Sequence, residues 1–321
     1  MIGAGMAGLT CARALTEAGM RVRVFDKSRG PSGRMGTRRA GETRHFDHGA
    51  QYFTARDPAF EAEVLRWEEA GVVAPWRGRI VTLGPGEHGR SDDAVVRWVG
   101  TPRMSALGRH LARGLHVGYG VRIETVVRDD ARWELADDQG QSHGTFTHVV
   151  VAVPAGQAVA LLSANPLLAQ QAAAVQMEPC WAVMFEAAPA WRVGFDAAFV
   201  GDWQVAWAAR QSSKPGRPDA DTWVVHATPS WTQQHWDDAP EIVARTLVAA
   251  LATAAEHAAP AVTWSTAHRW RYARVHTPVG QPCLYDEGTG LGAAGDWCQG
   301  ARVEAAFSSG RALAERMLGS R

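Results

Sequence analysis

The chain begins Met1-Ile2-Gly3-Ala4-Gly5-Met6-Ala7-Gly8, and this stretch decides the fold. Its three glycines have the spacing GxGxxG, and an apolar helical pattern follows from Leu9 to Ala18 and ends before Gly19. The next segment, Arg21 to Asp26, alternates as a strand does and ends in an acid, at about the ~20-residue offset expected after the glycines. This order of turn, helix, strand and acid is typical of a dinucleotide-binding Rossmann unit.

Each position of the motif has a physical role in such a unit. Gly3 would permit a tight turn, Gly5 would let backbone N–H groups approach a pyrophosphate, and Gly8 would let the helix pack closely on the strand. The positive end of the helix dipole would favour the phosphates, and Asp26 would accept hydrogen bonds from ribose hydroxyls. We therefore expect a dinucleotide to be bound by Gly3, Gly5, Met6, Ala7, Gly8, Asp26 and Lys27.

A second GxGxxG match, from Gly290 to Gly295, is rejected by its context. No strong strand precedes it, and the chain ends at Arg321, too soon for a helix, a second strand and an acid. The first match has a defect of its own, because only Met1 and Ile2 precede Gly3, whereas a central strand usually has about 5–6 residues. Either the true start lies upstream or the protein tolerates a short central strand.

Composition limits the class of protein. The chain has 321 residues, 46% hydrophobic and 21% charged, which suits two domains with buried cores. Its 33 basic and 33 acidic residues leave no net charge, which argues against a nucleic-acid binder. No apolar run approaches the ~18 residues of a membrane span. The four cysteines form no CxxC pair and no secretory signal opens the chain, so we expect a cytoplasmic protein without a metal site or disulfides.

The segments after Asp26 do not continue as the alternating βα units of a nicotinamide dehydrogenase. A Gly/Ser/Arg loop occupies residues 27–36, two short strands are expected around Gly41, and the segment His45 to Thr54 follows. Near the C-terminus, Gly292 to Trp297 precedes a long helix from about Arg302 to Leu318.

With these motifs the chain resembles the FAD-dependent amine-oxidase-like flavoproteins, and within them the bacterial renalase-like oxidoreductases. The resemblance covers both ends of the chain and, more weakly, the middle. It implies that the Gly-rich turn and Asp26 bind the ADP half of FAD, and that the family's Gly-Gly-Arg loop is here Ser32-Gly33-Arg34, with Ser in place of the first Gly. It also implies that Gly49-Ala50-Gln51 lie beside the flavin ring and that Asp296 binds the ribityl chain. The N-terminus of the last helix, at Ala301, Arg302 and Val303, would face the flavin pyrimidine and stabilise the negative charge of the reduced flavin.

We expect an α/β fold in which a Rossmann-like, mainly parallel FAD-binding domain carries an inserted antiparallel-sheet substrate domain. The apolar strand 147–153 resembles the one that returns the family's chain to its FAD domain, which would comprise residues 1–55, 100–155 and 275–321. The substrate domain would comprise residues 56–99 and 156–274. Within it we expect strands around 180–186, 203–210, 223–227 and 262–271, an amphipathic helix over 240–257 and an exposed loop at 212–218.

Hydride transfer to a flavin requires a donor held over N5 in a dry slot at ~3–3.5 Å, so no protein residue need be catalytic. Aromatic walls suit a flat substrate, and nine of the 14 Trp lie between Trp181 and Trp270, although any single Trp more often serves packing. The expected substrate-binding residues are Gln51, Trp270, Arg271, Tyr272 and Trp297. Arg269, Arg271 and Arg274 would either hold a substrate's phosphates or form one charged face of an edge strand.

Other chemistries have weaker support. His45, Asp47 and His48 would point to different faces of an extended segment, which argues against a metal site, and Cys298 has no obvious base. True amine oxidases often use a substrate-domain lysine, but the only lysines are Lys27, beside the expected ADP site, and Lys214, in the expected exposed loop.

By resemblance, the expected activity is oxidation of isomeric dihydronicotinamide dinucleotides, with dioxygen as the electron acceptor and hydrogen peroxide as a product. The alternatives are an oxidase of small amines, a non-catalytic FAD-binding module and a nicotinamide dehydrogenase without flavin.

Overall fold

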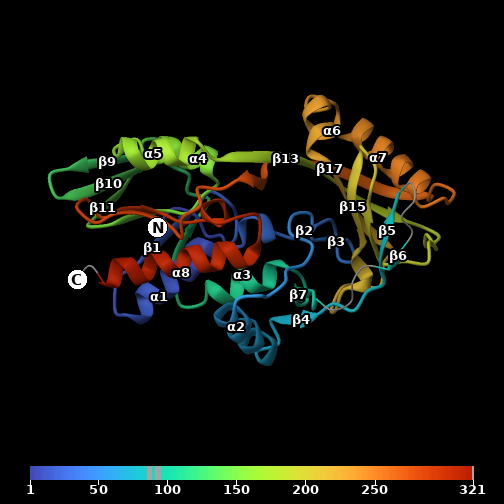
Figure 1. Ribbon diagram of the computed structural model, residues 1–321, viewed down its shortest axis with the longest axis horizontal. Coiled ribbons are helices and arrows are strands. Elements are labelled where there is room, and N and C mark those ends of the chain that lie inside the picture. The colour runs from blue at the N-terminus through green and yellow to red at the C-terminus, as the bar shows by residue number, and fades with distance from the viewer. Residues whose placement is uncertain (85–88, 91–94, 320–321) are drawn as a thin grey trace.

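The computed structural model describes residues 1–84, 89–90 and 95–319, which form two lobes joined by long strands (Figure 1). In the first lobe, β1 (Arg23–Asp26) pairs in parallel with β8 (His116–Tyr119), and β12 (Val149–Val151) pairs in parallel with β19 (Leu291–Ala293). The edge strand β18 (Leu284–Asp286) is antiparallel to β19. The mainly parallel sheet expected for a Rossmann-like domain is confirmed.

The start of the chain joins the two halves of this sheet. Ile2 bridges both Phe25 of β1 and Val151 of β12 in parallel. The Ile2 amide donates to the Val150 carbonyl at 2.8 Å, and the Gly3 amide donates to the Phe25 carbonyl at 2.8 Å. Met1 to Gly3 therefore occupy the central position of the sheet, although they are too short to form a regular strand.

Successive side chains of a strand point to opposite faces of the sheet. Both faces of this sheet are buried, because each packs in a different hydrophobic core. Val24 and Val150 pack in one core with α1 (Met6–Glu17), α2 (Pro58–Glu69), α3 (Ser105–Leu111) and α8 (Val303–Gly319). Phe25 and Val151 pack in another core with α4 (Ala155–Leu161), α5 (Pro166–Ala173), β9 (Ile123–Asp129) and β10 (Arg132–Asp137). The strand β11 (Ser142–Phe146) completes a small antiparallel sheet with β9 and β10.

The second lobe contains a seven-stranded sheet. Neighbouring strands in it run antiparallel, with one exception. The exception is the parallel pair of β14 and β5. The sheet order is β17 (Val262–Thr277), β13 (Gln176–Ala187), β16 (Thr222–Ala227), β15 (Val205–Arg210), β14 (Ala197–Val200), β5 (Ile80–Leu83) and β6 (Gly89–Arg90). The helices α6 (Pro229–Gln234) and α7 (Pro240–Ala254) cover one face over a core that contains Trp181, Trp191, Trp223 and Trp231.

The remaining elements are short. They are η1 (Gly33–Met35), β2 (Arg38–Arg39), β3 (His45–Phe46), β4 (Val73–Pro75), β7 (Trp98–Gly100), η2 (Gln211–Ser213) and η3 (Asp296–Cys298). Figure 1 shows β13 and β17 running from the region of α4 to the second lobe, where they enter its sheet.

Two inserted segments pack with the first lobe. The side chains of Phe60 and Trp67 on α2 contact Phe307 on α8, and α4 and α5 share the core of β12 and β19. The expected substrate-domain segments 56–99 and 156–274 thus begin with helices that pack in the cores of the first lobe, and the domain division itself stays a proposal.

In the part of the chain that the structure describes, no helix combines the length and the apolar character needed to cross a bilayer.

Candidate active site

The Gly-rich turn leaves the N-terminus of α1 open. Gly3 has φ +109°, and a Cβ there would lie 2.6 Å from the Ala152 carbonyl oxygen, while a Cβ on Gly8 would collide with the Gly3 carbonyl oxygen. A Cβ on Gly5, in contrast, would meet no atom within 4 Å. The N-cap of α1 is Gly5, and no side chain among the described residues caps this helix. Since the first N–H groups of a helix lack intrahelical partners, this cradle fits the pyrophosphate of a dinucleotide.

Asp26 is fixed at the end of β1 beside this turn. Its Oδ2 accepts a hydrogen bond from the Ala4 amide at 2.6 Å, and its Oδ1 accepts one from the Ser28 amide at 2.7 Å. A carboxylate offers about four acceptor positions, so Asp26 can still accept from ribose hydroxyls. The neighbouring Lys27 is exposed, and its Nζ lies 3.3 Å from Gln157 Oε1 on α4.

The loop at Ser32 lies directly against the Gly-rich turn. A Cβ on Gly33 would lie 3.4 Å from the Gly5 Cα, and the Ser32 amide donates to the Ala4 carbonyl at 2.9 Å. Ser32 has φ 119°, a conformation that glycine adopts most easily. Its buried Oγ donates to the Ser105 carbonyl at 3.2 Å, which helps to hold serine in this conformation.

Arg34 connects four segments that are far apart in the sequence. Its guanidinium forms a bidentate ion pair with Asp296, with N–O distances of 2.9 and 2.5 Å. It also donates to the Ala273 carbonyl of β17 at 3.2 Å, and the Arg34 carbonyl accepts from the Ala50 amide at 2.9 Å. The Gly-Arg loop, the segment around Gly49, β17 and the turn before α8 therefore meet at one place.

Aromatic and imidazole rings form one wall beside Gly49. A Cβ on Gly49 would lie 3.5 Å from Trp270 Cζ2, and the His48 carbonyl accepts hydrogen bonds from Trp270 Nε1 at 3.1 Å and His226 Nε2 at 3.0 Å. The His48 ring lies 5.0 Å from the Trp270 ring and 5.1 Å from the His268 ring, between centroids. Sequence reasoning placed Trp270 here but missed His226 and His268, which only strand register brings to this face.

These histidines are neutral at pH 7. Burial lowers the pKa of His48 to about 4 and that of His226 to about 4. Burial, followed by the charge of Arg38, lowers the pKa of His268 as well. The Nδ1 atom of His48 is buried and has no hydrogen-bond partner among the described residues. The rings of this wall are tilted or edge-on to one another, and the wall is uncharged and able to form a further hydrogen bond.

The loop 212–218 was expected to be exposed, and for Lys214 this is wrong. The Lys214 side chain is 0% exposed, and its Nζ contacts Gln51 Oε1 at 3.0 Å, Gln211 Oε1 at 3.1 Å and Asp47 Oδ2 at 3.7 Å. The ammonium also lies 5.4 Å from the Trp76 ring centroid. Loop composition predicted exposure, but this loop folds inward because its cations pair with a buried carboxylate.

Asp47 is that carboxylate. It accepts hydrogen bonds from Arg217 Nη2 at 2.5 Å and Thr37 Oγ1 at 2.6 Å, and burial disfavours its charged form. Lys214 and Arg217 nevertheless hold the pKa of Asp47 below its usual value. Burial lowers the pKa of Lys214 to about 7, against the opposing charge of Asp47. Lys214 can therefore exchange a proton near neutral pH.

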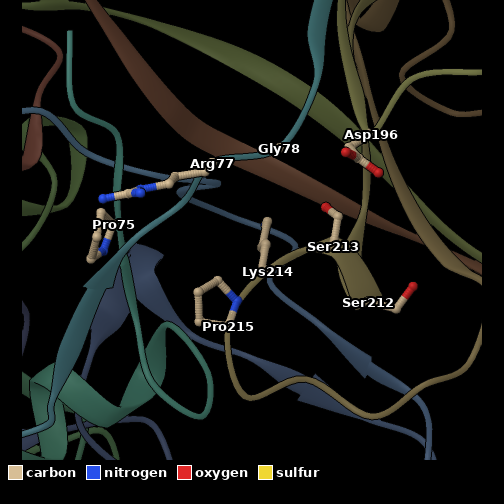
Figure 2. A pocket seen from close by; sticks show the side chains of 8 residues that line it. All are labelled: Pro75, Arg77, Gly78, Asp196, Ser212, Ser213, Lys214 and Pro215. Atoms are coloured by element: carbon tan, nitrogen blue, oxygen red, sulfur yellow. The ribbon is translucent and has the colours of Figure 1, made fainter.

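A hollow of 490 Å³ lies beside Lys214. Figure 2 shows it between the segment that carries Pro75, Arg77 and Gly78 and the segment from Ser212 to Pro215, with Asp196 at its side. The hollow gives this side of the Lys214 segment an opening towards solvent.

The remaining expected site residues lie in different places. Trp297 is 0% exposed and its Nε1 donates to the Val153 carbonyl at 3.0 Å, so it belongs to the core of the first lobe and does not line this site. Tyr272 packs against Gly156 at the start of α4. Arg302 is exposed immediately before α8, which begins at Val303 as expected. Arg271 lies on the opposite face of β17 from Trp270, over the Trp236 ring.

Comparison with known proteins agrees with this geometry. Residues 1–65 match the family model of the NAD(P)-binding Rossmann-like domain. The whole chain is similar in structure to a candidate protoporphyrinogen oxidase from Exiguobacterium sp. 255-15, with a TM-score of 0.81, 11% identity and coverage of 100% of this chain and 98% of that one. Cyclohexylamine oxidase from Brevibacterium oxydans IH-35A gives a TM-score of 0.76 at 14% identity, covering 99% and 98%. A putrescine oxidase variant with redesigned cofactor binding gives 0.70 at 16% identity, covering 100% and 98%.

At these identities the likeness shows the fold. The chain therefore has the two-lobed fold of these oxidases, with a Rossmann-like dinucleotide-binding lobe and a large sheet beside it.

Proposed function

We propose that this chain is an FAD-dependent oxidase that accepts a hydride from isomeric dihydronicotinamide dinucleotides. When bound, FAD supplies the hydride acceptor at its N5 and returns two electrons, with two protons, to dioxygen, which gives hydrogen peroxide. The oxidised nicotinamide dinucleotide is the other product.

The site fits this cofactor. The open N-terminus of α1 at Gly5 would hold the pyrophosphate and Asp26 the ribose, while Asp296 retains acceptor positions for ribityl hydroxyls. The segment from Gly49 to Gln51 would lie along the ring. The N-terminus of α8 offers a partial positive charge, which would stabilise the reduced flavin.

The observation that carries the substrate assignment is the sign of the charge around the neutral ring wall. Burial is the main cause that lowers the pKa of these imidazoles, and nearby cations add to it: Arg38 acts on His48 and His268, and Arg103, Arg39 and Arg217 act on His45. Asp47, the acid among the described residues that raises the pKa of His45 and His48, is already bound to Arg217 and Lys214. A protonated amine would be repelled here, whereas the two phosphates of a dinucleotide would be attracted.

The buried Lys214 favours a second candidate, oxidation of a small amine. Its Nζ bonds to Gln51, which we place beside the flavin, and its pKa of about 7 suits proton transfer. The sequence argued against amine oxidation because Lys214 was expected in an exposed loop. In the folded chain Lys214 is buried beside Gln51, so this argument no longer holds.

Anaerobic mixing of the FAD-loaded protein with single substrates distinguishes the candidates. We expect isomeric dihydronicotinamide dinucleotides to bleach the flavin absorbance faster than cyclohexylamine or putrescine, with a rate at low substrate that falls as salt screens the arginines. Faster bleaching by either amine would replace the proposal by the second candidate. Tight FAD binding without reduction by any of these compounds would favour a non-catalytic module.

A further inference from the structure

A second hollow, of 250 Å³, lies on the helix-covered face of the large sheet. It is lined by Pro179, Gln233, Trp236 and Arg271. We propose that this hollow binds a nucleoside diphosphate. Taken with the proposed function, on which this identification rests, the ligand is the ADP end of the dihydronicotinamide dinucleotide.

Arg271 is the positively charged group that an anion would meet. Its guanidinium lies 5.6 Å from the Trp236 ring centroid and has no hydrogen bond or ion pair within the described ranges. The other two arginines of the cluster form ion pairs, since Arg269 pairs with Asp237 at 3.6 Å and Arg274 pairs with Glu178 at 2.6 Å. The Arg269 guanidinium also lies 4.4 Å from the Trp236 ring centroid, which adds a second positive charge beside the hollow. The structure therefore distinguishes Arg271, which has no ion pair within the described ranges, from the two arginines that have one. The sequence alone gave no such distinction.

The rest of the hollow suits a planar base and its phosphates. Trp236 is half-buried and offers an indole N–H that no described residue accepts, and Gln233 adds an exposed amide. Pro179 supplies an apolar wall. An aromatic ring beside a guanidinium that has no hydrogen bond or ion pair within the described ranges is a combination that can hold a nucleotide base and a phosphate together.

The strand β17 contributes to both the hollow and the candidate active site. Trp270 and Arg271 are consecutive on β17, with side chains on opposite faces, and β17 is the edge strand of its sheet. A dinucleotide with its nicotinamide against Trp270 can therefore cross the sheet edge and place its second nucleotide beside Trp236.

The test uses the FAD-loaded protein and the matched variants Arg271→Gln and Arg274→Gln. Calorimetric titration with ADP should show binding that Arg271→Gln weakens about tenfold and Arg274→Gln leaves within about twofold. With dihydronicotinamide dinucleotide isomers, Arg271→Gln should raise KM about tenfold at unchanged kcat. The corresponding dihydronicotinamide mononucleotide, which lacks the second nucleotide, should be unaffected. Equal melting temperatures of the two variants would show that each is folded.

The outcomes separate this inference from the proposed function. Absence of ADP binding, equal loss in both variants or an equal KM effect on the mononucleotide overturns the inference. Arg271-dependent binding of ADP to a protein whose flavin no dihydronicotinamide reduces supports the nucleotide site and overturns only the proposed reaction.

Discussion

His48, His226 and His268 come from three separate segments yet lie in one half-buried cluster with Trp270. Burial disfavours the charged form of each imidazole and lowers its pKa, so the three histidines stay neutral at pH 7. Under the proposed function, the neutral dihydronicotinamide ring would therefore meet uncharged side chains.

The same burial makes stability depend on pH. Between pH 6.5 and 4 an unfolded His226 binds a proton that the folded one, with a pKa of about 4, does not bind, so the free energy of unfolding falls as pH falls through this window. We expect His226→Gln, which keeps an N–H donor for the His48 carbonyl, to reduce that fall by roughly 3 kcal/mol at most. Urea unfolding of both proteins at pH 4.5 and 7 measures the difference. Parallel pH profiles would show that His226 is not held neutral.

Lys214 marks the limit of residue-scale prediction. Its neighbours Pro215 and Gly216 are typical of an exposed turn, and nothing local signals that Asp47 lies buried within reach. The Gly-rich turn and the position of Asp26 were predictable because they belong to a motif of fixed spacing, whereas the positions of Lys214 and His226 depend on contacts that no such motif encodes.

At the scale of elements, α1 and α8 pack closely at Gly310. A Cβ on Gly310 would collide with the Ala7 carbonyl oxygen in the first turn of α1, which side-chain motion cannot relieve. Alanine in a helix gains up to about 1 kcal/mol in propensity over glycine, but overpacking against backbone costs about 1–3 kcal/mol. We therefore expect Gly310→Ala to lower the free energy of unfolding by about 1–2 kcal/mol.

Denaturant unfolding measures this change, with Gly319→Ala as the control. Gly319 lies at the exposed end of α8, where a Cβ would meet no atom within 4 Å. A Gly310→Ala protein as stable as the control would mean that the two helices can move apart without cost.

Elements with strong local sequence patterns were predicted correctly, whereas two short strands of the large sheet were missed. The alternation of residues 23–26, the apolar run before Pro154 and the amphipathic pattern after Pro240 correspond to β1, β12 and α7. The strands β14 and β5 were not predicted, because four-residue strands acquire their hydrogen bonds only by pairing with each other and with distant neighbours.

At the scale of the whole molecule, the predicted motifs lie in order along one path from Asp26 through Gly5 and Arg34 to Trp270. The Arg34–Asp296 pair and the Arg34–Ala273 hydrogen bond connect the first lobe to β17. A cofactor along this path would contact both lobes, so its binding should stabilise the whole fold.

Gly5 tests this directly, because its Cβ position is open in the protein yet lies where the pyrophosphate is expected. Gly5→Ala should change the unfolding free energy of the FAD-free protein by no more than about 0.5 kcal/mol. FAD at 100 times its Kd should stabilise the natural protein by about 2.7 kcal/mol, and a tenfold weaker site in the variant would retain only about half of that. Gly8→Ala, whose Cβ would collide with the Gly3 carbonyl oxygen, should destabilise the protein even without FAD. Thermal unfolding with and without FAD gives all three comparisons, and equal stabilisation of the natural and Gly5→Ala proteins would place the cofactor away from α1.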